Sequence, residues 1–158
     1  MPEPPTARSA ALRGVINVRS GRIGRLRLGR STEADLIRAF GKPDRTTNTQ
    51  DYGQKPFRTL EWRCAPRGCL LYTQLRRGRL SLLSASRLGK RSLPGFRTSA
   101  GTRLGMSVAV AERRERKSAQ TDCVTAITKR HHGHTLKILF YSGVSTLVLY
   151  DRRAFYTC

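Results

Sequence analysis

The stretch Ile23-Gly24-Arg25-Leu26-Arg27-Leu28-Gly29-Arg30-Ser31-Thr32 occurs a second time, in degraded form, as Gly101-Thr102-Arg103-Leu104-Gly105-Met106-Ser107. In both copies an apolar-Gly turn leads into a Ser-led segment of helical pattern and then into sequence of β pattern. About half of the chain separates the anchor glycines, Gly29 and Gly105. A motif that recurs at this spacing predicts one supersecondary unit used twice, with both copies burying a shared core.

The clearest helix in the sequence follows the first copy of the motif. Ser31 or Thr32 can cap this helix, and Asp35 stands three residues after Thr32, in the position of a capping box. The helix is expected to end at Gly41, which suits a left-handed C-cap, because Pro43 blocks its continuation. The apolar stripe that would face the core consists of Leu36, Ile37 and Phe40.

Strand-like runs follow each helical segment, and short Gly-containing turns join them, as antiparallel hairpins require. A polar loop at 44–56 precedes the first group. Ser107 is expected to begin the second helix, which must be short or lie on the surface because it has no large core residue after Glu112. The predicted strands are 15–18, 58–63, 69–75, 79–85, 124–128, 135–141, 146–151 and 154–157.

Together these elements predict an α+β fold, with two tandem helix-plus-antiparallel-meander repeats that share or abut their sheets. The Pro-rich residues 1–14 are expected to form a disordered leader. The first repeat is expected at 15–87, a linker at 88–95 and the second repeat at 96–158.

The charge of the chain is strongly unbalanced, with 31 Lys and Arg against 10 Asp and Glu and a formal net charge of +21. A compositional bias towards Arg explains the arginines but not the scarcity of acidic residues. A field of this sign attracts polyanions, so we expect affinity for an anionic surface or polymer. Specific recognition of nucleic acid is not expected, because the basic and aromatic residues show no regular spacing that would stack successive bases.

Four cysteines, an even number, allow a full set of disulfides in three connectivities. Their order along the chain favours Cys64–Cys69 in the first half and Cys123–Cys158 in the second. Paired cysteines indicate an oxidising compartment outside the cytoplasm.

The sequence contains no segment with the length and apolarity of a transmembrane helix, and its first 12 residues hold no signal-peptide core. Either a targeting peptide is absent from this chain, or the protein is cytosolic and the disulfide prediction fails. We favour the first alternative and expect a secreted or cell-envelope protein.

The first copy of the motif resembles the BamE (SmpA/OmlA) pattern, through Leu28-Gly29-Arg30-Ser31-Thr32, Leu36 and Phe40-Gly41-Lys42-Pro43. Two such units in tandem, each with a cysteine pair, are similar to the architecture of the β-lactamase inhibitor protein family. The resemblance implies two helix-plus-sheet repeats that join their sheets and present a concave face to a protein partner. It implies a binding or envelope-associated module and does not extend to β-lactamase inhibition, since no matching binding motif is present.

Residues that could carry chemistry are scattered. His131, His132 and His134 could in principle join Cys64 and Cys69 in a zinc site, but Cys64-x4-Cys69 exceeds the usual ligand spacing. A solvated turn is the favoured interpretation of the histidines. The few carboxylates form no pair that spacing can identify, so we expect no catalytic residue, no metal, no cofactor and no enzymatic activity.

Strand alternation predicts the binding surface. One face should pack on the helices through Leu60, Trp62, Leu71, Thr73, Leu75, Leu136, Ile138 and Phe140. The opposite face would present the candidate binding residues Arg63, Tyr72, Gln74, Lys137, Tyr141 and Tyr150. Tyr and Arg are enriched at interface hot spots, so the predicted function is non-catalytic binding of an unidentified protein through this face. The alternatives are a merely solvated face and a basic protein that binds nucleic acid or another polyanion.

Overall fold

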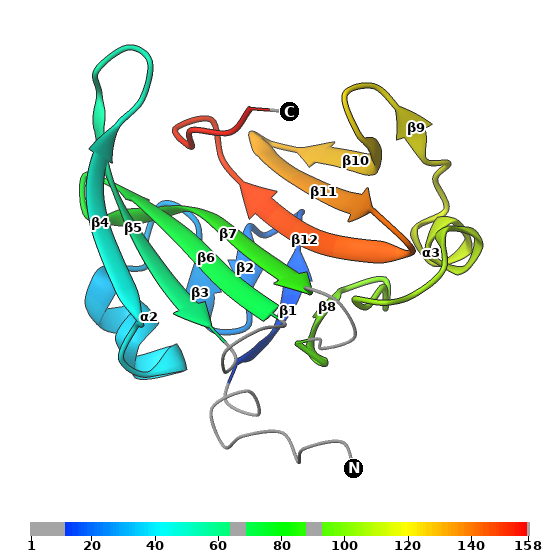
Figure 1. The fold of residues 1–158 in the computed structure, drawn as a ribbon, viewed down its shortest axis with the longest axis horizontal. Coiled ribbons are helices and arrows are strands. Elements are labelled where there is room, and N and C mark those ends of the chain that lie inside the picture. The colour runs from blue at the N-terminus through cyan, green and yellow to red at the C-terminus, as the bar shows by residue number, and fades with distance from the viewer. Residues whose placement is uncertain (1–11, 64–68, 88–92, 158) are drawn as a thin grey trace.

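The computed structural model describes residues 12–63, 69–87 and 93–157, and its strands form two sheets (Figure 1). The large sheet has eight strands in the order β4-β5-β6-β7-β12-β11-β10-β9, and the small sheet has four in the order β3-β2-β1-β8. The elements are β1 Arg13–Asn17, β2 Arg22–Ile23, β3 Leu26–Arg27, α2 Glu33–Phe40, β4 Arg45–Gln50, β5 Pro56–Arg63, β6 Cys69–Arg76, β7 Arg79–Arg87, β8 Gly95–Thr98, α3 Val108–Glu115, β9 Gln120–Thr121, β10 Thr125–His131, β11 His134–Phe140 and β12 Val144–Tyr150.

The predicted α+β fold with helix-plus-meander repeats is wrong, because the structure is mostly β. Half of it lies in strands, and the described residues hold only two helices of eight residues each. The inner face of the large sheet was expected to pack on helices, but much of that layer is the small sheet. In the small sheet β1 pairs in parallel with β8 and antiparallel with β2. Its short strands are hard to find from sequence because two-residue strands carry no measurable alternation.

One predicted loop and one predicted strand also differ from the observed elements. The segment 44–56 contains β4, which pairs with β5 along its whole length, although its Thr- and Asn-rich sequence reads as a loop. Residues 154–157 form no strand. The first strand begins at Arg13, and most of the predicted leader and linker lies outside the described residues.

Helix α2 confirms the predicted capping box at its N-terminus. The Thr32 hydroxyl accepts a hydrogen bond from the Asp35 amide, and the Asp35 carboxylate accepts one from the Thr32 amide at 2.9 Å. Gly41 is the C-cap, but with φ of 84° and ψ of −170° it is not in the left-handed helical conformation that was predicted. Its carbonyl accepts a hydrogen bond from the Trp62 indole at 2.9 Å. Phe40 packs edge-on against Trp62, with ring centroids 5.5 Å apart, so the helix is fixed to the inner face of β5.

The two motif glycines make the same backbone contact in the two halves of the chain. The Gly29 amide donates to the Leu80 carbonyl, and the Gly105 amide donates to the Val144 carbonyl, both at 2.8 Å. Both glycines have positive φ, 78° and 87°, which favours a residue without a Cβ. Each turn thereby attaches to the start of β7 or β12.

Strands β7 and β12 join the two halves into one sheet. They pair antiparallel from Leu82↔Tyr150 to Ser86↔Thr146. The side chains of β5, β6 and β11 that were predicted to face inward are buried, Phe140 only partly. All except Thr73 belong to, or pack against, one hydrophobic core cluster that also takes in the small sheet. Neither described helix is long and apolar enough to cross a membrane.

Helix α3 is held by a buried carboxylate rather than by an apolar stripe. Its buried residues are Ala111 and Glu115, the latter 4% exposed. The Glu115 carboxylate accepts hydrogen bonds from the hydroxyls of Thr98 and Thr102 at 2.6 and 2.5 Å and from the Lys129 ammonium at 2.7 Å. One side chain therefore ties α3 to the end of β8, to the following turn and to β10.

We predict that Glu115→Ala lowers the free energy of unfolding by about 3–5 kcal/mol, because it leaves the Lys129 ammonium and two hydroxyls without their acceptor. Glu112→Ala is the matched control on the same helix, and it should cost only about 1 kcal/mol, since Glu112 accepts one hydrogen bond from the Ala119 amide. Urea denaturation of both variants measures the difference. Equal losses would show that Glu115 does not anchor the helix.

Candidate functional site

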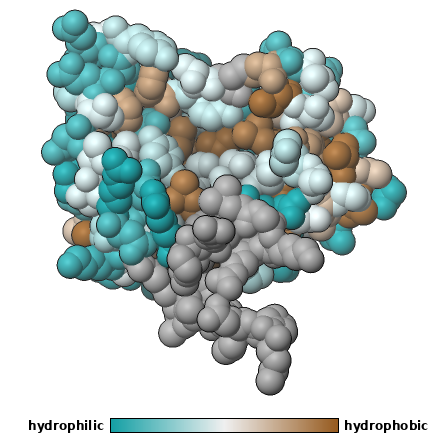
Figure 2. Space-filling view, viewed as in Figure 1, coloured by the Kyte–Doolittle hydropathy of each residue, from teal (hydrophilic) through white to brown (hydrophobic). Residues whose placement is uncertain are grey.

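Five of the six predicted binding residues share one face of the large sheet. The pairing of neighbouring strands aligns Glu61, Tyr72, Ser84, Val148 and Lys137 in one row across five strands. In the adjacent rows lie Arg63, Gln74 and Tyr150. We call this surface, opposite to the core, the open face. Figure 2, viewed as Figure 1, shows hydrophobic surface across the middle of the molecule and into its right side, with mostly hydrophilic surface on the left.

Tyr141 does not belong to the open face, contrary to the prediction. Strand β11 ends at Phe140, after an irregularity between Leu139 and Phe140, and Tyr141 begins the turn to β12. Its side chain is 84% exposed. The alternation predicted for 135–141 fails at this end because the chain is already turning towards Gly143, whose φ is 85°.

Gln74 lies on the open face but is only 3% exposed, so it is not the accessible contact that was predicted. Its side-chain amide donates to the Phe155 carbonyl at 2.7 Å, and its side-chain oxygen accepts from the Phe155 amide at 2.9 Å. It also donates to the Tyr72 hydroxyl at 3.1 Å. Residues 151–157, which we call the C-terminal segment, therefore cover part of this face.

Arg76 is the second anchor of the C-terminal segment. Its guanidinium donates to the Arg153 carbonyl at 2.7 Å and to the carbonyls of Lys55 and Pro56 at 3.0 and 3.1 Å. It also forms an ion pair of 2.5 Å with Asp51. A nearly buried arginine thus fastens both the β4–β5 hairpin and the C-terminal segment to β6.

The C-terminal segment adds a ring to the open face that the sequence did not indicate. Tyr156 stacks on Tyr150, with centroids 4.6 Å apart, and the Lys137 ammonium lies 5.3 Å from the Tyr156 centroid. Burial raises the pKa of Tyr72, Tyr150 and Tyr156. Three tyrosines and a lysine therefore form the centre of the face.

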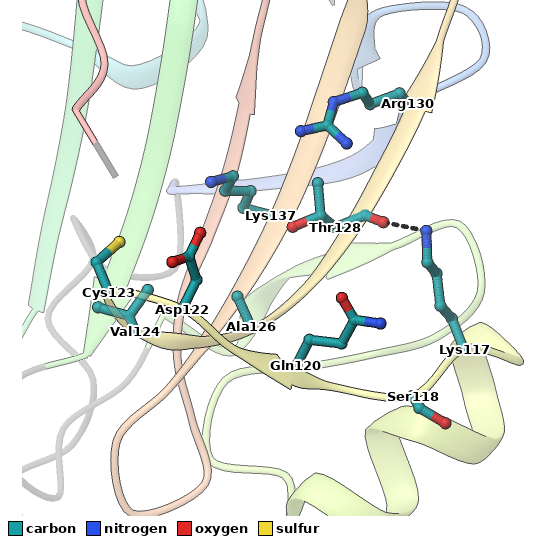
Figure 3. A pocket seen from close by; sticks show the side chains of 10 residues that line it. All are labelled: Lys117, Ser118, Gln120, Asp122, Cys123, Val124, Ala126, Thr128, Arg130 and Lys137. Carbon is teal, nitrogen blue, oxygen red and sulfur yellow. Dashed lines mark hydrogen bonds between the residues drawn. The ribbon is translucent and has the colours of Figure 1, made fainter.

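A pocket of about 270 Å³ continues the open face over β9, β10 and β11 (Figure 3). Lys117, Arg130 and Lys137 contribute positive charge to its lining, and Asp122 contributes one carboxylate. The Lys117 ammonium is engaged with the Thr128 carbonyl at 2.5 Å. Sequence reasoning missed Arg130, although its alternation with Thr128 in β10 places both on the open face.

The three histidines lie at or beside the tight turn between β10 and β11. The rings of His131 and His132 are 4.1 Å apart, and a ring nitrogen of His134 lies 3.1 Å from the Val18 carbonyl oxygen. Desolvation, followed by the positive neighbours His132 and Arg19, lowers the pKa of His131. Within 12–63, 69–87 and 93–157, no group of three or more His, Cys, Asp or Glu side chains is arranged to hold a metal ion.

Cys123 lies in the loop between β9 and β10 and is disulfide-bonded. Cys64 and Cys158 lie outside the described residues, and Cys69 begins β6 with its side chain not described. The pairs Cys64–Cys69 and Cys123–Cys158 therefore stay predictions.

Comparison with known proteins gives a likeness of fold only. No family model matches the chain, and no curated protein is significantly similar to it. A cysteine-rich secretory protein from Staphylococcus aureus superposes with a TM-score of 0.50 at 10% identity, over 89% of this chain and 50% of that one, so this chain spans half of that protein. A DUF4309 family protein from Bacillus subtilis superposes with a TM-score of 0.48 at 14% identity, over 82% of this chain and 84% of that one. The BamE resemblance stays a prediction.

We predict that Gln74→Ala releases the C-terminal segment from the open face and costs about 1–3 kcal/mol of stability, because it removes both hydrogen bonds to the Phe155 backbone. The direct measurement is hydrogen exchange at the Phe155 amide, which should accelerate. Ser84→Ala, on the same face, is the control and should leave this exchange unchanged. Unaltered exchange in Gln74→Ala would show that other contacts hold the segment.

Proposed function

We propose that this chain is a non-catalytic, extracytoplasmic module that binds a protein partner through the open face of its large sheet. The observation that carries the proposal is the grouping of Tyr72, Tyr150, Tyr156 and Lys137 around the row that crosses β6, β7, β12 and β11. Tyrosines offer large contact areas at a small cost in side-chain entropy, which is why they dominate interface hot spots.

The charges beside these rings favour a partner with an acidic surface. Arg130 and Lys137 line the pocket next to the aromatic centre, where Asp122 supplies the opposing charge. A carboxylate of the partner that reached both cations would make charge-assisted hydrogen bonds in a partly desolvated place. Charge complementarity of this kind speeds encounter and fixes the orientation of the complex more than it adds affinity.

A binding role rather than catalysis is supported by what the carboxylates do. Asp35 caps α2, Asp51 pairs with Arg76, and Glu115 anchors α3. Asp151 forms an ion pair of 2.6 Å with Arg153 inside the C-terminal segment. These groups serve the fold, and a general acid or base among them would have to give up a structural contact.

The proposal of an extracytoplasmic location rests on the disulfide of Cys123, because such bonds persist in oxidising compartments. We predict that protein isolated from its native cells, alkylated without reductant, shows no free thiol by intact mass. A reduced and alkylated sample from the same preparation should carry four labels and serves as the control. Four labels without reductant would place the protein in a reducing compartment and contradict this part of the proposal.

We predict that a photo-crosslinking side chain at position 72 captures a protein in the native cells and that the adduct has one defined mass. The matched control carries the same side chain at position 37 on α2. Ile37 was predicted to face the core, but it is 41% exposed and lies away from the open face. Lys137→Ala should lower the yield of the adduct at position 72 at least about tenfold if the lysine lies at an interface hot spot.

Adducts of equal yield from positions 72 and 37 would contradict a dedicated binding face. The captured protein can then be purified and titrated against Tyr72→Ala, whose side chain is only half-buried and whose loss leaves the core intact. A purified partner that binds wild type and Tyr72→Ala equally would also overturn the assignment.

A further inference from the structure

Five exposed arginines gather at one end of the large sheet, from three segments distant in sequence. They come from the turn before α2, from the β6–β7 hairpin and from the C-terminal segment. We call them the arginine cluster, which consists of Arg30, Arg77, Arg79, Arg152 and Arg153.

Backbone contacts of the fold hold these segments together. The Arg79 guanidinium donates to the Arg30 carbonyl at 3.0 Å, and the Arg153 guanidinium donates to the Leu80 carbonyl at 3.0 Å. A Cβ on Gly29 would lie 3.7 Å from the Arg153 guanidinium, so the motif turn and the C-terminal segment approach closely here. Arg77 sits at the tip of the hairpin with φ of 50°.

Described carboxylates neutralise only part of the positive charge of the cluster. Asp151 pairs with Arg153, and Asp51 pairs with the nearly buried Arg76. Among the described side chains no carboxylate forms an ion pair with Arg30, Arg77 or Arg79. A set of uncompensated guanidinium groups on a fixed scaffold is suited to anions, and above all to phosphate, which guanidinium binds in bidentate geometry.

A groove of about 950 Å³ extends from the cluster along the C-terminal segment to the β4–β5 hairpin. Arg77, Arg152 and Arg153 line it at the cluster, and Lys55 lines it towards the hairpin, next to Arg58, which is ion-paired with Glu33 at 2.8 Å. Basic groups along an open groove fit a chain of phosphates rather than a single phosphate group.

We propose that the arginine cluster and this groove form a second binding site, for a linear polymer of phosphates that is recognised through its charged backbone. The two phenylalanine rings that line the groove, Phe57 and Phe155, argue against recognition of bases, because each contacts another ring. Phe57 is buried, with the Arg76 guanidinium 5.0 Å from its centroid, and Phe155 lies between Phe57 and Tyr52 at 5.6 and 5.0 Å. Stacking of successive bases requires free ring faces.

The site is separate from the proposed protein-binding face, so its test needs no protein partner. The probe is inorganic polyphosphate of defined length, titrated against wild type, against the triple variant Arg77→Gln, Arg79→Gln, Arg152→Gln and against a matched control. The control is Arg13→Gln, Arg103→Gln, Arg113→Gln, which removes the same charge from exposed positions on β1, before α3 and on α3.

We expect the cluster variant to bind polyphosphate at least about tenfold more weakly and to lower the slope of log Kd against log salt by about 1 for each arginine removed. The control should change affinity far less, and thermal unfolding should show that both variants remain folded. Equal losses in the two variants would mean that the general charge, not this site, binds the polymer. Failure of the wild type to bind would also overturn the site.

A second comparison uses single-stranded DNA with the same number of phosphates. We expect it to bind no more tightly than polyphosphate and to be unaffected by Tyr52→Ala, a substitution at the most exposed ring beside the groove, 88% exposed. Tighter binding of the DNA that depends on Tyr52 would assign the site to nucleic acid through base stacking and overturn the phosphate-only proposal.

Discussion

The pairing of β7 with β12 is the interaction on which the rest of the structure depends. Through it, two antiparallel meanders become one eight-stranded sheet with a continuous core on one side. Leu83 and Leu149 face each other across this ladder on the core side, while Ser84 and the buried Val148 occupy the opposite face. Without the ladder, the row from Tyr72 to Lys137 would be two unrelated surfaces, and the open face would not exist.

The C-terminal segment determines which side chains are covered and which are accessible on the outer side of the large sheet. Gln74 and Arg76 would be costly groups to bury on a sheet face, and each satisfies its polar atoms with the backbone of this segment. The same contacts bring Tyr156 onto Tyr150 and Arg153 beside the β6–β7 hairpin. One short stretch of irregular chain therefore helps to build both proposed binding surfaces.

The distribution of charge follows from the small number of carboxylates. Asp35, Asp51 and Glu115 are placed where they cap a helix, pair with a nearly buried arginine or anchor α3. Because these acids are used within the fold, many arginines remain on the surface without an acidic neighbour. The net charge of +21 is therefore carried largely by exposed arginines, of which the arginine cluster is one group.

Local sequence determined the elements whose signals lie within a few residues, namely the capped helix from Thr32 to Gly41, most strands of the large sheet and their inward faces. It also placed Arg63, Tyr72, Lys137 and Tyr150 on one surface, since alternation fixes the face once a strand is known. The fold class, β4, the small sheet, the burial of Gln74 and the role of Glu115 were decided only by tertiary structure. They depend on hydrogen bonds between residues far apart in the chain, and the periodicity of a single strand or helix contains no information about those partners.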